Sequence, residues 1–220
     1  MADALVLQGY RYSVYTRIVR VVLAEKGLQF TYQDVNPFRG TSKPTLHPFG
    51  RVPVLLHSDA VIFETSAITR YLDARFDGLS LTPDAALAQA RMAQVICLID
   101  AYAYWPMVRQ VFAHRVFRPL EEEPVDETEV ANGLSASLPV LKALEQLVQM
   151  GDGVGGPVFT LADAHLAPIL DYFVRAREGR QALADYPNLE TWLERVLKRP
   201  SLVESDPRLP ALAQYPVRNE

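Results

Sequence analysis

The chain has only one cysteine in 220 residues, no long apolar run and no excess of positive charge. A single cysteine excludes a disulfide within the chain and a cysteine-rich metal site. No apolar run approaches the ~18 residues of a membrane-spanning helix, and the N-terminus lacks the pattern of a signal peptide. With a net charge of −4 and no basic stripe, nucleic acid is not an expected partner. We therefore expect a cytoplasmic protein that binds no metal, no membrane and no nucleic acid.

The composition is that of an ordinary globular protein, because 49% of the residues are hydrophobic and 22% are charged. A chain of this length can bury an adequate core as one large domain or two small ones. Cys97 lies in the apolar run of residues 95–99. We expect it to be a small buried residue of that core.

The first third of the chain alternates between strand and helix patterns. Val14, Ile18 and Val22 recur at helical spacing, and Gly27 ends that helix. The predicted order is strand, helix, strand, loop, strand, strand and helix, at residues 4–7, 14–27, 29–35, 36–50, 52–56, 60–63 and 65–76. A β-α-β unit of this size implies parallel strands joined by a right-handed crossover. This order is typical of a thioredoxin-like domain, predicted to span residues 1–78.

After a linker at residues 79–83, the pattern favours helices throughout residues 84–220. A long helix is predicted from residue 84 to about 115, with a kink or interruption at Pro106. Further helices are predicted at about 126–150, after the capping box that starts at Thr160, and from Pro187. The predicted fold class is therefore an α/β domain followed by an all-α domain.

Several short segments, taken in order and with their spacing, resemble the cytosolic glutathione transferase family. In the first domain the segments are Ser13 to Arg20 with Leu23 to Leu28, Pro48 to Leu55, and Phe63 to Ile68. In the helical domain they are Thr160 to Asp163 and the stretch from Tyr186 to Ser201, which includes Tyr186 to Leu189, Trp192 and Arg199 to Ser201. The pattern at residues 9–28 is most similar to serine-type bacterial and plant phi-like members. The resemblance implies an N-terminal thioredoxin-like domain that binds glutathione, an all-helical C-terminal domain and a homodimer.

The resemblance implies a glutathione site around Val52, Pro53, Glu64 and Thr65. A cis peptide bond at Val52–Pro53 would expose the Val52 backbone to pair with the cysteinyl backbone of the ligand. The first turn of the helix at Thr65 would bind the γ-glutamyl carboxylate, and Glu64 would accept from its ammonium group. Arg51 is a further partner for a glutathione carboxylate. The residues alone also fit a trans proline, a simple helix cap and a solvated arginine.

Ser13 is placed to hold the glutathione thiolate, since it stands at the start of the first helix. Lowering a thiol pKa from about 8.5 by about two units requires roughly 2.7 kcal/mol. A hydrogen bond to a charged group supplies about 1.5–3 kcal/mol, and the helix N-terminus about 0.3–1 kcal/mol. Tyr10 is the main rival as hydroxyl donor, followed by Tyr12, Tyr15 and Thr16. Because no Cys occupies the Ser13 position, disulfide exchange through the protein is not expected.

Two further parts of the site are assigned on weaker patterns. Lys43, in a loop that also holds Arg39 and His47, is expected to bind the glycyl carboxylate. An aromatic-rich helical stretch predicts an apolar pocket for a small hydrophobic electrophile, lined by Tyr102, Trp105 and Phe112. The predicted function is glutathione transfer to that electrophile, with glutathione as co-substrate. A scaffold without turnover, or a glutathione-dependent peroxidase or isomerase on the same site, remain alternatives.

Overall fold

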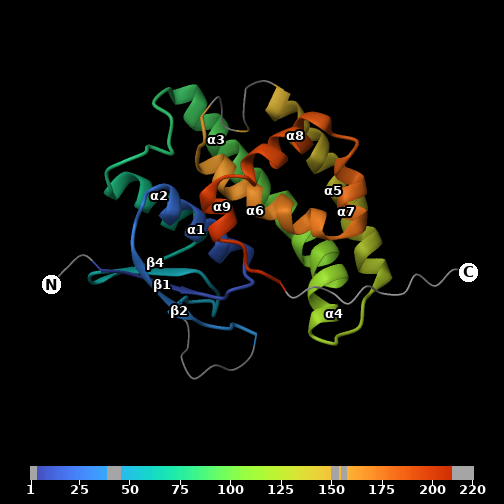
Figure 1. Ribbon diagram of the computed structural model, residues 1–220, viewed down its shortest axis with the longest axis horizontal. Coiled ribbons are helices and arrows are strands. Elements are labelled where there is room, and N and C mark those ends of the chain that lie inside the picture. The colour runs from blue at the N-terminus through green and yellow to red at the C-terminus, as the bar shows by residue number, and fades with distance from the viewer. Residues whose placement is uncertain (1–3, 39–45, 150–153, 155–157, 210–220) are drawn as a thin grey trace, which may run out of the picture.

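The computed structural model describes residues 4–38, 46–149, 154 and 158–209, which form a sheet domain beside a larger group of helices (Figure 1). The sheet holds β1 (Leu5–Gly9), β2 (Phe30–Asp34), β3 (Val54–His57) and β4 (Ala60–Phe63) in the order β2-β1-β3-β4. β1 runs parallel to β2 and antiparallel to β3, and β4 runs antiparallel to β3. The central strands β1 and β3 carry the apolar residues, and Leu7 and Leu55 are fully buried.

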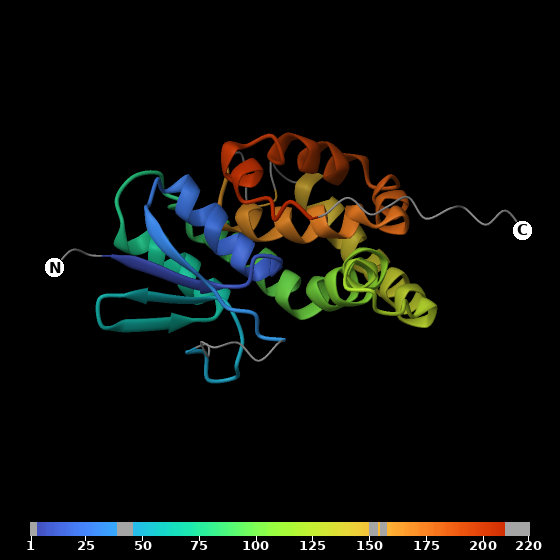
Figure 2. The same cartoon turned by 60° about the horizontal axis from the view of Figure 1, so that its bottom comes forward.

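Helix α1 (Val14–Glu25) lies between the sheet and the helical domain (Figure 2). It therefore has apolar residues on most of its circumference, and Ile18, Val19 and Leu23 are fully buried. Its contacts are with α2 (Thr65–Arg75) on one side and with helices of the C-terminal domain on the other. α1 thus joins the apolar core of the sheet domain to that of the helical domain, and residues 10–13 connect it to the end of β1.

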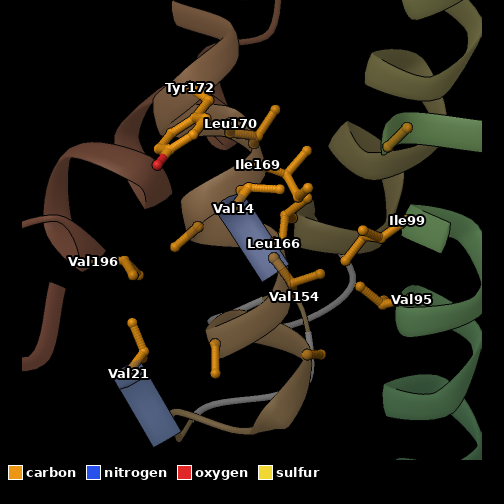
Figure 3. Packing of buried hydrophobic residues seen from close by; sticks show 14 of the residues in the cluster. Val14, Val21, Val95, Ile99, Val154, Leu166, Ile169, Leu170, Tyr172 and Val196 are labelled. Atoms are coloured by element: carbon orange, nitrogen blue, oxygen red, sulfur yellow. The ribbon is translucent and has the colours of Figure 1, made fainter. Parts of the chain in front are cut away.

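The helical domain begins with α3 and η1 and is built around α6. Its elements are α3 (Ala86–Leu98), η1 (Ile99–Phe117), α4 (Arg118–Leu120), α5 (Glu127–Gln149), α6 (Leu161–Arg175), α7 (Arg177–Leu183), α8 (Pro187–Val196) and α9 (Pro200–Glu204). Every residue of α6 from Leu161 to Val174 is buried, because neighbouring helices surround it. Figure 3 shows Val14 of α1, Ile99 of η1 and Leu166 of α6 in the same core.

Four hydrogen bonds fix the linker and the start of α6. The Lys26 ammonium donates to Asp73 and to the Leu79 carbonyl, and the Leu81 N–H donates to the Asp73 carboxylate at 2.9 Å. The Leu81 carbonyl then accepts from the Leu161 N–H at 2.9 Å. The limits of the two domains at residues 78 and 84 stay predictions.

One expectation for the helical domain is wrong, and the short helices α7 and α9 were not predicted. The helix is not interrupted at Pro106, since η1 continues through it with the wider i→i+5 hydrogen bonding of a π-helix, and a kink there stays a prediction. Cys97 is exposed rather than buried, since it faces away from the core that Val95 and Ile96 enter. Helices α7 and α9 have only 7 and 5 residues, too few for a helical pattern to be recognised.

Candidate active site

Two adjoining cavities lie where the sheet domain meets η1. The larger has a volume of about 490 Å³ and the smaller about 240 Å³. The larger is lined by Tyr10, Tyr12, Ser13, Val14, Tyr15, Pro37, Phe38, Gly50, Arg51, Val52, Asp100, Tyr104, Trp105, Val108, Arg109, Phe112, Ala113 and Phe117. The smaller is lined by Tyr15, His47, Arg51, Val52, Pro53, Glu64, Thr65, Ser66, Asp100 and Tyr104. The strand-to-helix turns of the first domain thus form one wall, and η1 forms the other.

Ser13 is the N-cap of α1 and lines the larger cavity. Its Oγ accepts a hydrogen bond from the Thr16 N–H at 3.2 Å, which fixes the side chain at the start of the helix. Its own N–H donates to the Tyr10 carbonyl at 2.9 Å, which closes the turn from β1. No acceptor within the described part of the chain takes the Ser13 hydroxyl proton. That proton can therefore be donated to an anion in the cavity.

The rival hydroxyls differ in what they contact. The Tyr15 hydroxyl donates to Asp100 Oδ1 at 3.0 Å, and Thr16 is buried and lines neither cavity. Tyr10 and Tyr12 both line the larger cavity, and their rings meet edge to face at 5.5 Å. The Tyr15 hydroxyl is therefore already bonded to Asp100, and Thr16 is buried away from the cavities. Ser13, Tyr10 and Tyr12 are the remaining candidates, and all three line the larger cavity.

The expected glutathione residues meet in the smaller cavity. The Val52–Pro53 peptide bond is cis, as predicted. Thr65 is the first residue of α2 and is buried, whereas the Glu64 side chain is 63% exposed. Arg51 lines both cavities. All five of these residues therefore surround a space that faces the N-terminus of α2, and Arg51 and Val52 also line the larger cavity.

His47 stands beside Glu64, with its Nε2 3.5 Å from Glu64 Oε1. The Phe49 N–H donates to His47 Nδ1 at 3.1 Å. Since Nδ1 accepts, the neutral ring carries its proton on Nε2, the side of Glu64. His47 is thus placed to orient the Glu64 carboxylate, whereas the sequence suggested it only as a partner of the glycyl carboxylate. Lys43, the other candidate there, lies outside the described residues.

Asp100 is a second carboxylate of the smaller cavity. Burial raises its pKa, the hydrogen bond from Tyr15 lowers it, and the nearby charge of Glu64 raises it, with a raised pKa as the result. Burial also raises the pKa of the Tyr15 phenol, and the Asp100 charge and hydrogen bond act in the same direction. The phenol therefore stays protonated, and Tyr15 and Asp100 connect α1 to η1 across the cavity wall.

The cavity-facing residues of η1 form two adjacent rows along the helix. They recur at every fourth position, as Asp100, Tyr104, Val108 and Phe112 in one row and Trp105, Arg109, Ala113 and Phe117 in the next. Of the expected electrophile residues, Trp105 and Phe112 line the larger cavity. Tyr102 is 65% exposed and lines neither cavity, because it lies on the opposite side of this helix.

Asp100 and Arg109 are lining residues that sequence reasoning missed. Two signals for them were usable in the sequence, because Asp100 interrupts an apolar run and Arg109 lies four residues after Trp105. Within the described residues, no three His, Cys, Asp or Glu side chains are grouped to hold a metal ion. No helix in that part of the chain is long and apolar enough to cross a membrane.

Two family models and several curated relatives match the chain. Residues 12–75 match the glutathione S-transferase N-terminal domain, and residues 104–200 match the glutathione S-transferase C-terminal domain. Glutathione S-transferase F14 of Arabidopsis thaliana is 31% identical over 191 residues, which cover 82% of this chain and 74% of that protein. Glutathione S-transferase 3 of Zea mays is 30% identical over 213 residues, covering 93% and 95% of the two chains.

Solved structures match over nearly the whole chain. Glutathione S-transferase III in its apo form has a TM-score of 0.83 and 28% identity, covering 94% of this chain and 98% of that one. Glutathione S-transferase I bound with lactoylglutathione has a TM-score of 0.78 at 20% identity, covering 92% and 98%, a likeness of fold. The chain belongs to the glutathione S-transferase family. The predicted family, its serine-type phi-like class and the two-domain fold are confirmed.

Proposed function

We propose that this glutathione transferase activates its co-substrate through Ser13, whose hydroxyl donates a hydrogen bond to the glutathione thiolate. The observation that carries the proposal is the Ser13 side chain at the mouth of α1, fixed by the Thr16 N–H and lining the larger cavity beside Val52. The serine does not act as a base or as a nucleophile. It lowers the free energy of the thiolate, and the thiolate sulfur is the attacking atom.

The free energies are sufficient for this role. A thiol pKa about two units below 8.5 corresponds to roughly 2.7 kcal/mol. One hydrogen bond to the charged sulfur supplies about 1.5–3 kcal/mol, and the N-terminus of α1 adds about 0.3–1 kcal/mol. Ser13 is half-buried, so water competes only in part for the same hydrogen bond.

The smaller cavity supplies the remaining glutathione contacts in this proposal. The backbone of Val52 pairs with the cysteinyl residue in the manner of an added strand. The Thr65 end of α2 holds the γ-glutamyl carboxylate, because the first N–H groups of a helix have no partner within the helix. Glu64, oriented by His47, and Asp100 face the ammonium group. Arg51 remains the candidate for the glycyl carboxylate, with Lys43.

The second substrate is an electrophile held in the larger cavity against η1. With an aryl halide, the thiolate sulfur forms a bond to the ring carbon and the halide leaves with its electron pair. A volume of about 490 Å³ accommodates a substrate of this size. A homodimer and a cytoplasmic location, both implied by the family resemblance, belong to the same proposal.

Steady-state kinetics with 1-chloro-2,4-dinitrobenzene tests the proposal. We expect Ser13→Ala to lower kcat/KM by about 10- to 100-fold, the equivalent of one hydrogen bond to a charged group. Ser13→Thr keeps the hydroxyl and should retain more activity, and Tyr10→Phe should leave the rate within about 3-fold. An equal loss in Tyr10→Phe but none in Ser13→Ala would assign the donor role to Tyr10. No turnover by the unmodified protein would favour the scaffold, and turnover of hydroperoxides alone would favour a peroxidase.

A further inference from the structure

We propose that the larger cavity selects an aromatic electrophile carrying one anionic group, such as a carboxylate, and that Arg109 recognises this group. The inference rests on the proposed transferase function and deepens it by naming the class of the second substrate. The sequence predicted an apolar electrophile, whereas we now expect an aromatic electrophile that also carries a negative charge. Arg109 would then determine part of the substrate specificity.

Arg109 is a half-buried cation of η1 that lines the larger cavity. Its guanidinium carbon lies 5.6 Å from the centre of the Phe38 ring and 6.0 Å from the centre of the Trp105 ring. Burial raises the pKa of the nearby Tyr104 phenol, and the charge of the guanidinium acts against this effect. These three aromatic residues position a planar charged group in the wall of the cavity.

The charge of Arg109 has no carboxylate partner in the part of the chain that the structure describes. None of the ion pairs found there includes Arg109, whereas Arg17, Arg175 and Arg199 are each paired with an acidic side chain. A guanidinium has five N–H donors, arranged so that two of them can bind one carboxylate. A partly desolvated cation binds an anion more strongly than a water-exposed one does.

The position of Arg109 separates it from the glutathione residues. Arg51 lines both cavities, but Arg109 lines only the larger one. Asp100 is the acidic side chain among the larger cavity's lining residues, and its Oδ1 already accepts from Tyr15. Aromatic rings such as Phe112 and Phe117 supply the apolar part of the wall. An aromatic ring bearing a carboxylate therefore matches both parts of this surface.

The reaction does not consume the recognised group. With 4-chloro-3,5-dinitrobenzoate, the thiolate sulfur bonds to the ring carbon, the carbon–chlorine bond breaks, and chloride leaves with the electron pair. The carboxylate on the opposite ring position is unchanged. The matching carboxamide, 4-chloro-3,5-dinitrobenzamide, has nearly the same shape but no charge, so the two compounds isolate the contribution of the anion.

The test compares kcat/KM for the benzoate and the benzamide, each divided by its uncatalysed rate constant with glutathione. We expect the corrected ratio to favour the benzoate in the unmodified protein. Arg109→Gln should lower this ratio by about 10-fold, the lower end for a charged hydrogen bond, and leave the benzamide rate within about 2-fold. Arg109→Lys should keep most of the preference. Arg91→Gln, at an exposed position of α3 outside both cavities, is the matched control and should change nothing.

Binding of the two glutathione conjugates by titration calorimetry separates this proposal from the transferase proposal. Tighter binding of the carboxylate conjugate that is lost in Arg109→Gln would support the anion site even without turnover. Turnover of both substrates with equal corrected rates would overturn it and leave the transferase function standing. A rise in KM for glutathione with both substrates in Arg109→Gln would also overturn it, because Arg109 would then bind the glycyl carboxylate. A failure of both conjugates to bind would overturn both proposals.

Discussion

At the scale of single residues, the hydroxyls at the start of α1 have different partners. Ser13 accepts from the Thr16 N–H and keeps its own proton for the cavity, whereas Tyr15 donates its proton to Asp100. The pair formed by Tyr15 and Asp100 explains why a tyrosine so close to the site is not a suitable thiolate donor. It also makes the charge of Asp100 depend on Tyr15.

We predict that Tyr15→Phe shifts the acid side of the glutathione affinity profile to higher pH. The Tyr15 hydrogen bond lowers the pKa of Asp100 against the effect of burial, so its loss raises that pKa further. A carboxylate that holds the ligand ammonium then becomes protonated at a higher pH, and affinity is lost earlier as the pH falls. Calorimetric titration with glutathione from pH 4 to 8 measures this. Asp100→Asn serves as the reference, because it removes the carboxylate. If the loss of affinity at low pH follows the same curve in Tyr15→Phe and in the unmodified protein, the prediction is contradicted.

Several of the predicted candidates that line the cavities lie in short segments with a fixed local geometry. Ser13, Val52 and Thr65 each stand at a strand or helix end, and the order of residue types there predicts the position of the side chain. Asp100 and Arg109 were missed because the pocket was expected to be apolar, so only apolar and aromatic residues of this helix were considered for it. Tyr102 was included because no local pattern indicated which side of the helix faces the cavity.

At the scale of elements, the connection between β1 and α1 sets the position of Ser13. Gly9 ends β1, and a Cβ atom built on it would lie 2.3 Å from Cγ2 of Thr16 in the first turn of α1. The strand and the helix can approach so closely only because residue 9 has no side chain. This close approach therefore helps to fix the position of the turn that carries Ser13.

We predict that Gly9→Ala lowers the free energy of unfolding by about 1–3 kcal/mol, the usual cost of overpacking. It should also lower kcat, because α1 must move away from β1 and take Ser13 with it. Urea denaturation and steady-state kinetics measure the two effects. Thr16→Ser removes the clashing methyl group and should recover part of both losses in the double variant. If the double variant loses as much as Gly9→Ala alone, the contact with Thr16 is not the cause.

At the scale of the whole molecule, buried polar contacts join the two domains. Arg17 of α1 forms an ion pair with Asp171 of α6, and Glu25 accepts from Arg199 at 2.9 Å. The α2–α6 contact contains His165, whose Nε2 lies 3.0 Å from Thr69 Oγ1. These contacts were not predictable from sequence, because each one joins residues from distant segments that no periodicity relates.

We predict that His165 makes the protein less stable in acid. Burial lowers the pKa of its imidazole from 6.5 to about 3, so the unfolded chain binds a proton between these values that the folded chain does not. The free energy of unfolding then falls as the pH falls from 6.5 toward 3, by about 1.4 kcal/mol per pH unit from this group. Denaturation at several pH values should give a shallower slope for His165→Gln. An unchanged slope would assign the acid sensitivity to other groups.

The central claim concerns the protonation state of bound glutathione, and ultraviolet difference absorbance of the thiolate as a function of pH measures it most directly. We predict a thiolate band in the unmodified protein with a pKa about two units below the free thiol value of about 8.5. In Ser13→Ala the band should appear only near the free thiol pKa. A band that persists unchanged in Ser13→Ala would contradict the role of Ser13 and, if it then disappears in Tyr10→Phe, would assign that role to Tyr10.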